Sequence, residues 1–113
     1  MARAAAATDL FTAIAEAPRR EILDALVDGE RPVGELVEVL RMAQPRVSKH
    51  LRVLNDVGLV TCRAEGRRRL YRLNHERLRP LHAWLEKYER AWNERLDRMD
   101  DYLMDLQQEE RVR

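Results

Sequence analysis

The sequence predicts a mainly α-helical fold with one small β-hairpin and a long C-terminal helix. Three observations support this class. Apolar residues recur at helical spacing in two adjacent segments within 33–57, they change to a strand-like pattern around a glycine within 59–73, and they return after residue 80 at a mean spacing of about 3.5 residues. A chain of 113 residues suits one domain with one core, which we expect to span 1–113.

The composition is that of a folded domain with a strongly ionic surface, since 45% of residues are hydrophobic, 36% are charged and only 5% are aromatic. The low aromatic content argues against a sandwich or barrel packed on large rings. No apolar run approaches the roughly 18 residues of a membrane span, and the start MARAAAATDL lacks the apolar core of a signal peptide. The single cysteine, Cys62, has no partner for an internal disulfide. We therefore expect a cytoplasmic protein with no membrane partner.

The net charge of +1 conceals a segregation along the chain. Residues 41–72 hold nine basic and two acidic residues, a local charge of +7, whereas residues 93–110 hold seven acidic residues and two arginines, a local charge of −5. This asymmetry is expected where one region of a protein contacts a polyanion. The alternative is two solvated faces that happen to differ.

Two helices are predicted before residue 30. Residues 1–7 are mostly alanine and are expected to fray. A short helix follows, with Thr8 or Asp9 as its cap and an apolar face of Leu10, Phe11 and Ile14. In the next helix Pro18 fits the first turn and Gly29 fits the C-terminal stop. The predicted buried face of this second helix is Ile22, Leu23, Leu26 and Val27.

A helix-turn-helix is predicted over 33–57, because two helices flank a three-residue corner at 41–43. The first helix presents Val33, Leu36, Val37 and Leu40. The second begins near Gln44, with Pro45 in its first turn. At about 100° per residue, the core-facing stripe of this second helix is Val47, Leu51 and Leu54. Its opposite side carries short hydrogen-bonding groups and cations but no acid.

A β-hairpin is predicted over 59–73, with Glu65 and Gly66 in the turn, where glycine adopts a positive φ. Three consecutive arginines, 67–69, lie at or beside its tip. A hairpin that served only to fill a core would not place them there.

A helix-turn-helix followed by an arginine-tipped hairpin is typical of a winged DNA-binding module. Gln, Arg, Lys and Ser near the start of the second helix suit the major groove, and the wing follows the backbone or the minor groove. The alternative is a small helical domain with an exposed basic face. His50, about 60° from the core stripe, is interpreted as a packing residue or a phosphate contact. The predicted DNA-binding residues are Gln44, Arg46, Ser48, Lys49, Arg52, Arg67, Arg68 and Arg69.

The segment VGELVEVLRMAQPRVSKHLRVLNDVGLVTCRAEGRRRLYRL resembles the ArsR family of winged helix-turn-helix repressors. Within it, QPRVSKHLRVLNDVGLV is similar to that family's recognition helix, and the tail WLEKYERAWNERLDRMDDYLMDL resembles the C-terminal helix of one subgroup. The resemblance covers residues 8–106. It implies a homodimer that binds a near-palindromic operator and represses transcription, with the DNA-binding residues named above at matching positions.

A turn at 75–79 and a helix over 80–107 complete the prediction, because Pro80 starts or breaks a helix. The apolar residues of this helix recur at a mean spacing of about 3.5, which suits helices that pack along their length. This spacing and the resemblance together indicate a dimer in which this helix and the first helix pair across a twofold axis. Trp84, Tyr88 and Trp92 recur at i, i+4 and i+8, so a ligand pocket is the alternative to an interface. The predicted interface residues are Leu10, Phe11, Leu85, Tyr88, Trp92, Leu96 and Met99.

Many members of the family sense metals, but the positions that the resemblance implies for ligands hold other residues here. One site uses a Cys-Val-Cys run, which corresponds to Pro32, Val33 and Gly34. The second site, counted from Asn74 and Glu76, falls near Lys87 without a ligand set. We therefore expect no metal and no cofactor.

Two smaller features bear on regulation. His82 and Glu86 share a helix face, but a surface contact explains such a pair more simply, since zinc takes about four ligands. Cys62 on a strand is more often a small core residue than a redox switch, which needs a resolving partner. A small-molecule or redox effector is not evident.

Two other classes of function are alternatives to a DNA-binding repressor. In an interaction module, the long helix would bind another protein and the basic region would add only non-specific affinity for nucleic acid. An enzyme is not expected, because Ser48, His50 and Cys62 do not form a nucleophile and base with an orienting acid, and no glycine-rich phosphate loop is present.

Overall fold

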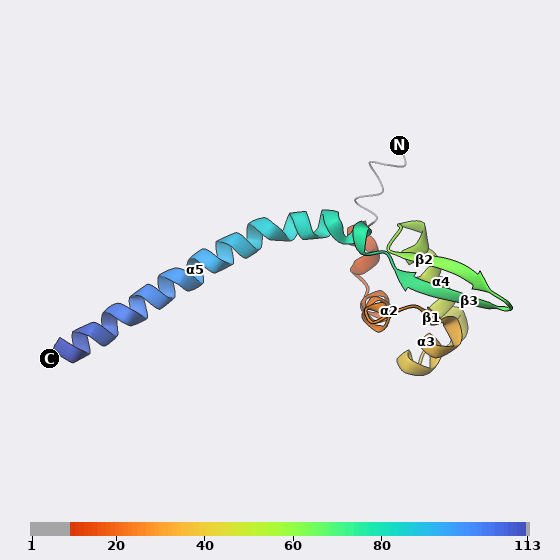
Figure 1. The fold of residues 1–113 in the computed structure, drawn as a ribbon, viewed down its shortest axis with the longest axis horizontal. Coiled ribbons are helices and arrows are strands. Elements are labelled where there is room, and N and C mark those ends of the chain that lie inside the picture. The colour runs from red at the N-terminus through yellow and green to blue at the C-terminus, as the bar shows by residue number, and fades with distance from the viewer. Residues whose placement is uncertain (1–9, 113) are drawn as a thin grey trace. The chain divides into compact units, whose positions relative to one another are not determined.

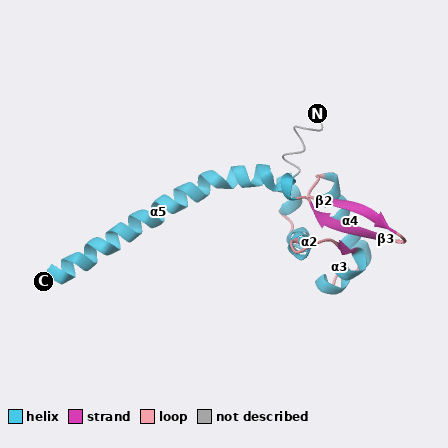
Figure 2. Cartoon of the chain, in the orientation of Figure 1, coloured by secondary structure: helices cyan, strands magenta, loops and turns pink. Residues whose placement is uncertain are grey.

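The computed structural model describes residues 10–112, which divide into two compact units, the first ending at Arg79 and the second beginning at Pro80 (Figure 1). All strands of the described chain belong to the first unit, and the second consists of helix alone (Figure 2). The sequence predicts one domain over 1–113, whereas the second unit has no core of its own, because none of its described side chains is buried.

The helices of the first unit follow the predicted order. Residues 10–14 are helical, and the fray predicted for 1–7 and the cap predicted at Thr8 or Asp9 lie outside the described residues. Helix α2 (Ala17–Leu26) has Pro18 in its first turn, where the fixed φ of proline suits the helix and its missing N–H costs no hydrogen bond. Helices α3 (Val33–Leu40) and α4 (Gln44–Asp56) form the predicted helix-turn-helix.

Arg41 makes the corner between α3 and α4. Its φ of 54° is left-handed, a conformation that few residues other than glycine adopt. The N–H of Arg41 donates to the carbonyl oxygen of Val37 at 2.9 Å, which closes the last turn of α3. Ala43 then has extended backbone, and Pro45 lies in the first turn of α4, so the new helix starts in a new direction.

The predicted hairpin consists of β2 (Val60–Glu65) and β3 (Arg68–Leu73), with Gly66 at a φ of 62° in the turn. The structure adds β1 (Arg31–Pro32), which the sequence does not predict, so the sheet has the antiparallel order β1-β3-β2. A two-residue strand containing proline carries no periodicity of its own and is recognised only through its partner. Leu70 of β3 lies opposite Pro32 on one side and opposite Arg63 on the other.

One apolar core joins the helices of the first unit to the base of the sheet. Two predictions are corrected here. Leu10, predicted at the dimer interface, is 0% exposed and belongs to this core. Val27, predicted on the buried face of α2, is 57% exposed, because α2 ends at Leu26 and Val27 follows its last turn. The largest fully buried side chains are Leu10, Ile22, Leu26, Leu36, Val47, Leu51, Leu54, Leu59 and Val60.

A short 3-10 turn, η1 (His75–Leu78), precedes α5 (Arg79–Val112). The turn matches the prediction for 75–79, but α5 continues beyond the predicted end at 107. The sequence QQEER contains no glycine or proline and consists of residues with good helix propensity, which explains the extension. Among the described residues, no helix is long and apolar enough to cross a membrane.

Candidate nucleic-acid interface

Helix α4 has two chemically distinct faces. Its inward stripe, Val47, Leu51 and Leu54, is at most 1% exposed and fills the core as predicted. Burial of this stripe fixes the rotation of the helix, because apolar area removed from water stabilises the fold by roughly 25 cal/mol per Å². The side chains on the opposite face are therefore held in solvent. All five predicted recognition residues are exposed, namely Gln44, Arg46, Ser48, Lys49 and Arg52.

His50 is the exception on this helix, because it is polar and yet only 7% exposed. The Nε atom of Arg19 in α2 donates to Nδ1 of His50 at 3.2 Å, and the Glu16 carboxylate lies 3.8 Å from the same nitrogen. Burial lowers the pKa of His50, and the positive charge of Arg19 lowers it further. The structure therefore assigns His50 to packing between α4 and α2 and not to a phosphate contact.

Side chains from the segment before α5 hold the C-terminal end of α4. The Nδ2 group of Asn74 donates to the Gly58 carbonyl at 2.9 Å, and the Nε group of Arg77 donates to the Val57 carbonyl at 2.7 Å. These carbonyls directly follow the last residue of α4 and have no partner within the helix, so the two bonds satisfy acceptors that would otherwise need water. Gly58 has a φ of 86°, which lets the chain turn directly from α4 into β2.

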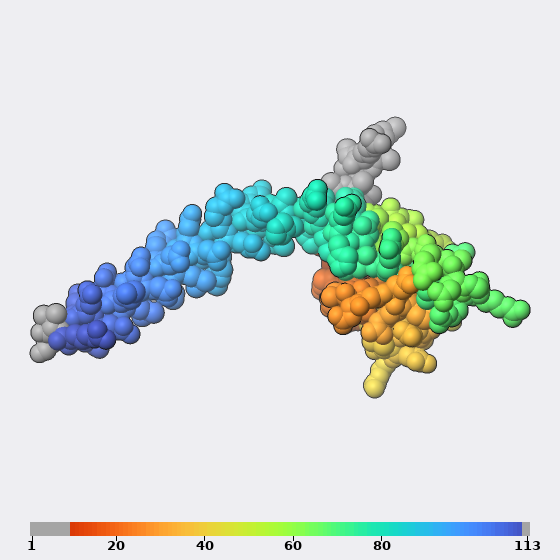
Figure 3. Space-filling view, viewed as in Figure 1, coloured from red at the N-terminus to blue at the C-terminus, as the bar shows by residue number. Residues whose placement is uncertain are grey.

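The β2–β3 hairpin forms the predicted wing, and its tip projects as a narrow extension from the first unit (Figure 3). Arg67 lies in the turn, while Arg68 and Arg69 are the first two residues of β3. Successive side chains of a strand point to opposite faces, so Arg68 and Arg69 are directed to different sides of the wing. All three arginines are exposed.

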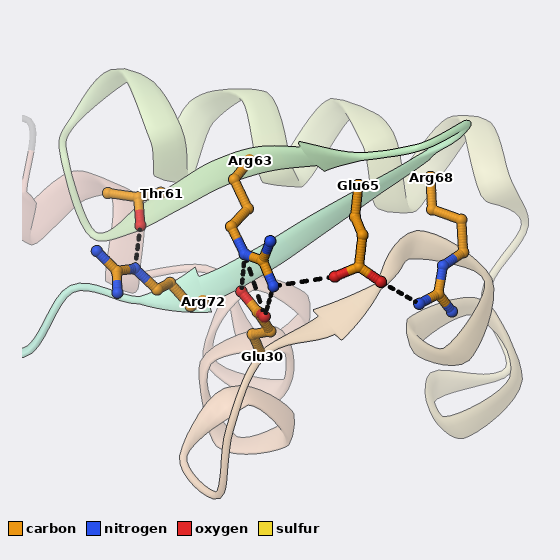
Figure 4. A network of polar contacts seen from close by, with 6 residues as sticks. All are labelled: Glu30, Thr61, Arg63, Glu65, Arg68 and Arg72. Carbon is orange, nitrogen blue, oxygen red and sulfur yellow. Dashed lines mark hydrogen bonds and ion pairs between the residues drawn. The ribbon is translucent and has the colours of Figure 1, made fainter.

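One face of the wing carries a chain of ion pairs (Figure 4). Arg63 of β2 pairs with Glu30, which precedes β1, and with Glu65 at 3.1 Å. Arg68 pairs with the other oxygen of Glu65, also at 3.1 Å. Farther along the same face, Arg72 donates to the Thr61 hydroxyl at 3.0 Å. The sequence does not suggest the Glu30 partner of Arg63, because Glu30 lies outside the hairpin.

A hollow brings the start of α4 close to the wing. It is lined by the segment from Pro32 to Glu35, by Glu38 and Gln44, and by the three arginines 67–69. The structure therefore unites the beginning of the predicted recognition helix with the predicted wing residues in one region. The more distant members of the predicted set, Lys49 and Arg52, lie farther along the same outward face of α4.

The described residues offer little for metal or redox chemistry. None of them form a group of three or more His, Cys, Asp or Glu side chains placed to hold a metal ion. His82 and Glu86 lie 3.0 Å apart on α5 as an exposed pair. Cys62 is half-buried opposite Tyr71, and burial raises the pKa of the Tyr71 hydroxyl, with a hydrogen bond to Cys62 adding to the rise.

Helix α5 presents a stripe of exposed apolar side chains. The predicted interface residues are 39% exposed at Leu85, 57% at Tyr88 and 61% at Trp92. Leu96 and Met99 continue the stripe, and so do Tyr102, Leu103 and Leu106. The rings of Trp84 and Tyr88 pack in a tilted arrangement, with centroids 5.0 Å apart and ring planes at 55°, and both side chains are exposed. Large side chains at this spacing are suited to packing against another helix.

The helix-turn-helix, the wing and the outward cations of α4 define a winged helix-turn-helix DNA-binding regulator. Comparison with known proteins then identifies the family. The sequence pattern of the bacterial regulatory protein, arsR family, matches residues 18–61. The chain is 40% identical over 78 residues to the HTH-type transcriptional regulator Rv2034 of Mycobacterium tuberculosis, covering 69% of this chain and 73% of that protein. This chain belongs to the ArsR family.

Two further relatives bear on function. The chain is 39% identical over 67 residues to the arsenical resistance operon repressor of Staphylococcus xylosus, covering 59% of this chain and 64% of that protein. A solution structure from Mycobacterium bovis, described as a homodimeric winged helix-turn-helix DNA-binding domain of a possible ArsR-family regulator, is similar with a TM-score of 0.66 and 31% identity. That likeness covers 78% of this chain and 82% of the other.

Proposed function

We propose that this protein is a homodimeric transcriptional repressor that binds a near-palindromic operator. Helix α4 enters the major groove with Gln44, Arg46, Ser48, Lys49 and Arg52, and the wing contacts the backbone or the minor groove through Arg67, Arg68 and Arg69. Family membership supports DNA binding and transcriptional regulation, and the relative named as a repressor supports the sign of the regulation.

The observation that carries this proposal is the outward face of α4. It displays Arg46, Ser48, Lys49 and Arg52, with Gln44 exposed in the first turn, while the opposite face of the same helix is buried in the core. Arg and Lys pair with guanine edges, Gln pairs with adenine, and Ser pairs with either. The acidic residue of α4, Asp56, is exposed at the C-terminal end of the helix and forms no ion pair among the described residues.

The homodimer is supported by the exposed stripe of α5 and by the homodimeric relative. The proposed contacts on α5 are Leu85, Tyr88, Trp92, Leu96 and Met99, and the first helix contributes Phe11. Leu10 is not among them, because its side chain is buried in the core. A twofold axis between two copies would place the two α4 helices about one DNA turn apart, ~34 Å.

An interaction module is the second candidate function, and the same exposed stripe favours it. In that case α5 binds a different protein, and the basic surface supplies only non-specific affinity. The two functions differ in how binding responds to salt, because a specific regulator keeps its preference for one duplex over random DNA as salt rises.

The test is selection of bound duplexes from a random pool, carried out with and without a zinc chelator. We expect one enriched sequence with twofold symmetry, unchanged by the chelator, since Pro32 and Gly34 supply no thiolates. Equal recovery of all duplexes would leave the interaction module as the function. Loss of selection in the presence of the chelator would show that DNA binding needs a metal ion held by residues other than Pro32 and Gly34.

A further inference from the structure

The ion pairs on the wing divide its arginines into two groups. The guanidinium group of Arg63 contacts two carboxylates. Its Nε atom donates to the two oxygens of Glu30 at 3.2 and 3.0 Å, and its Nη2 atom contacts both Glu30 and Glu65. These contacts raise the pKa of Arg63 and lower that of Glu30. Arg68 has a single contact with a carboxylate oxygen, the 3.1 Å bond from its Nη2 atom to Glu65.

The register of the hairpin explains why Glu65 takes this position. Glu65 and Arg68 are directly opposite each other, and Arg63 lies two residues before Glu65, so all three side chains share one face of the wing. Leu70, opposite Arg63, is on that face too, and it is 5% exposed although it does not belong to the main core cluster. The Arg63 end of the network therefore lies over a buried side chain, whereas Glu65 and Arg68 are at the solvent-exposed tip.

A carboxylate and a DNA phosphate offer a guanidinium group the same kind of acceptor. On the basis of the proposed function, we propose that the Glu65 carboxylate competes with the DNA backbone for Arg68. Glu65 holds Arg68 in the free protein and releases it to a phosphate on binding. Arg63 remains with Glu30 and anchors the wing. Arg67 and Arg69 make no ion pair among the described residues, so Arg68 is the wing cation whose availability Glu65 controls.

Breaking the Glu65–Arg68 ion pair costs little free energy, because exposed ion pairs are weak and the two side chains are 59% (Arg68) and 49% (Glu65) exposed. The ion pair nevertheless lowers the affinity for every duplex alike, because phosphate contacts carry no sequence information. Glu65 thus reduces the sequence-independent part of binding and leaves the contacts of α4, and with them the preference for one duplex over another, unchanged.

The test is a double-mutant cycle with wild type, Glu65→Gln, Arg68→Gln and the double variant, measured by fluorescence anisotropy on the selected duplex and on a random duplex. Glu65→Gln is expected to raise affinity about two- to fivefold on both duplexes. The same substitution is expected to give a much smaller gain once Arg68 is absent. An equal gain with and without Arg68 would show that Glu65 acts only by repelling phosphate, and it would overturn the proposal, as would no gain at all.

Asp56→Asn is the matched control, because Asp56 is the other acidic residue of the basic segment 41–72 and forms no ion pair among the described residues. Any gain from Asp56→Asn is expected to be independent of Arg68. Since Glu65 and Arg68 are exposed, all variants should melt near the wild-type temperature. The two proposals fail in different ways. If the proposed function is wrong, the wild type shows no preferred duplex. If only the Glu65 inference is wrong, that preference remains and the double-mutant cycle shows no coupling between Glu65 and Arg68.

Discussion

Arg19 of α2 and His50 of α4 are joined by a hydrogen bond of 3.2 Å from a guanidinium nitrogen to an unprotonated imidazole nitrogen. The bond needs neutral His50, because a protonated Nδ1 cannot accept. It ties the helix proposed to read DNA to the helix that precedes the helix-turn-helix. Burial and the charge of Arg19 both lower the pKa of His50, so the folded state favours the neutral form.

Stability is therefore expected to depend on pH through His50. The folded pKa lies below the unfolded value of about 6.5, so the unfolded state binds more protons in the interval between the two values. The His50 contribution is fully present above the unfolded pKa and is lost as pH falls through the interval towards the folded pKa. Thermal melting across this range should show a falling melting temperature on acidification. The slope should flatten in His50→Gln, whose amide oxygen can still accept from Arg19, and an unchanged slope would contradict the assignment. His82→Gln on exposed α5 is the control.

Lys49→Ala and Arg52→Ala are each expected to weaken operator binding by roughly 1–3 kcal/mol, because each removes a cation from the outward face of α4. Both side chains are exposed, so melting temperature and dimerisation should not change. Anisotropy titrations with the selected duplex measure the effect, with Arg90→Ala on α5 as the matched loss of one charge. If both variants bind as tightly as the wild type, α4 is not the recognition helix.

Trp92→Glu is expected to disrupt the dimer, since a charge would replace an indole in the middle of the apolar stripe of α5. Met104→Glu is a closely matched control, because Met104 is also 61% exposed but lies about 120° around the helix from Trp92. Sedimentation or light scattering should show a monomer for the first variant and wild-type association for the second. A dimeric Trp92→Glu protein would exclude the stripe as the interface.

Gly66→Val is expected to destabilise the wing tip by about 1–2 kcal/mol, because the φ of 62° is left-handed and a β-branched residue adopts it poorly. Apart from Gly66 and its two chain neighbours, no heavy atom lies within 4 Å of the position that a Cβ would occupy, so the backbone conformation sets the cost. Gly66→Asn should be nearly neutral, since asparagine tolerates this conformation. Hydrogen exchange of the wing amides measures the difference, and equal exchange in the two variants would contradict it.

Local patterns in the sequence predicted much of the fold. The stripe of Val47, Leu51 and Leu54 specifies both the burial and the rotation of α4, so the exposed face followed from periodicity alone. The change of period around Gly66 likewise located the wing. These signals are short-range, and each is contained within one element.

What the sequence did not predict depends on contacts between distant segments. Strand β1 exists because Arg31 and Pro32 pair with β3. Leu10 and Phe11 are adjacent apolar residues, and only tertiary packing shows that Leu10 is the fully buried one. The Glu30–Arg63 pair spans 33 positions, and the His50–Arg19 bond spans 31, so neither could be read from spacing.

The bonds from Asn74 and Arg77 to the end of α4 have a practical consequence for shortened versions of the protein. A fragment that stopped at Leu73 would contain the whole helix-turn-helix and the whole wing, yet it would leave the Val57 and Gly58 carbonyls without these donors. A fragment ending after Arg79 would keep both. The smallest fragment with an intact helix-turn-helix and wing therefore extends past the last strand, and a monomeric protein for binding one half-site is best ended after Arg79.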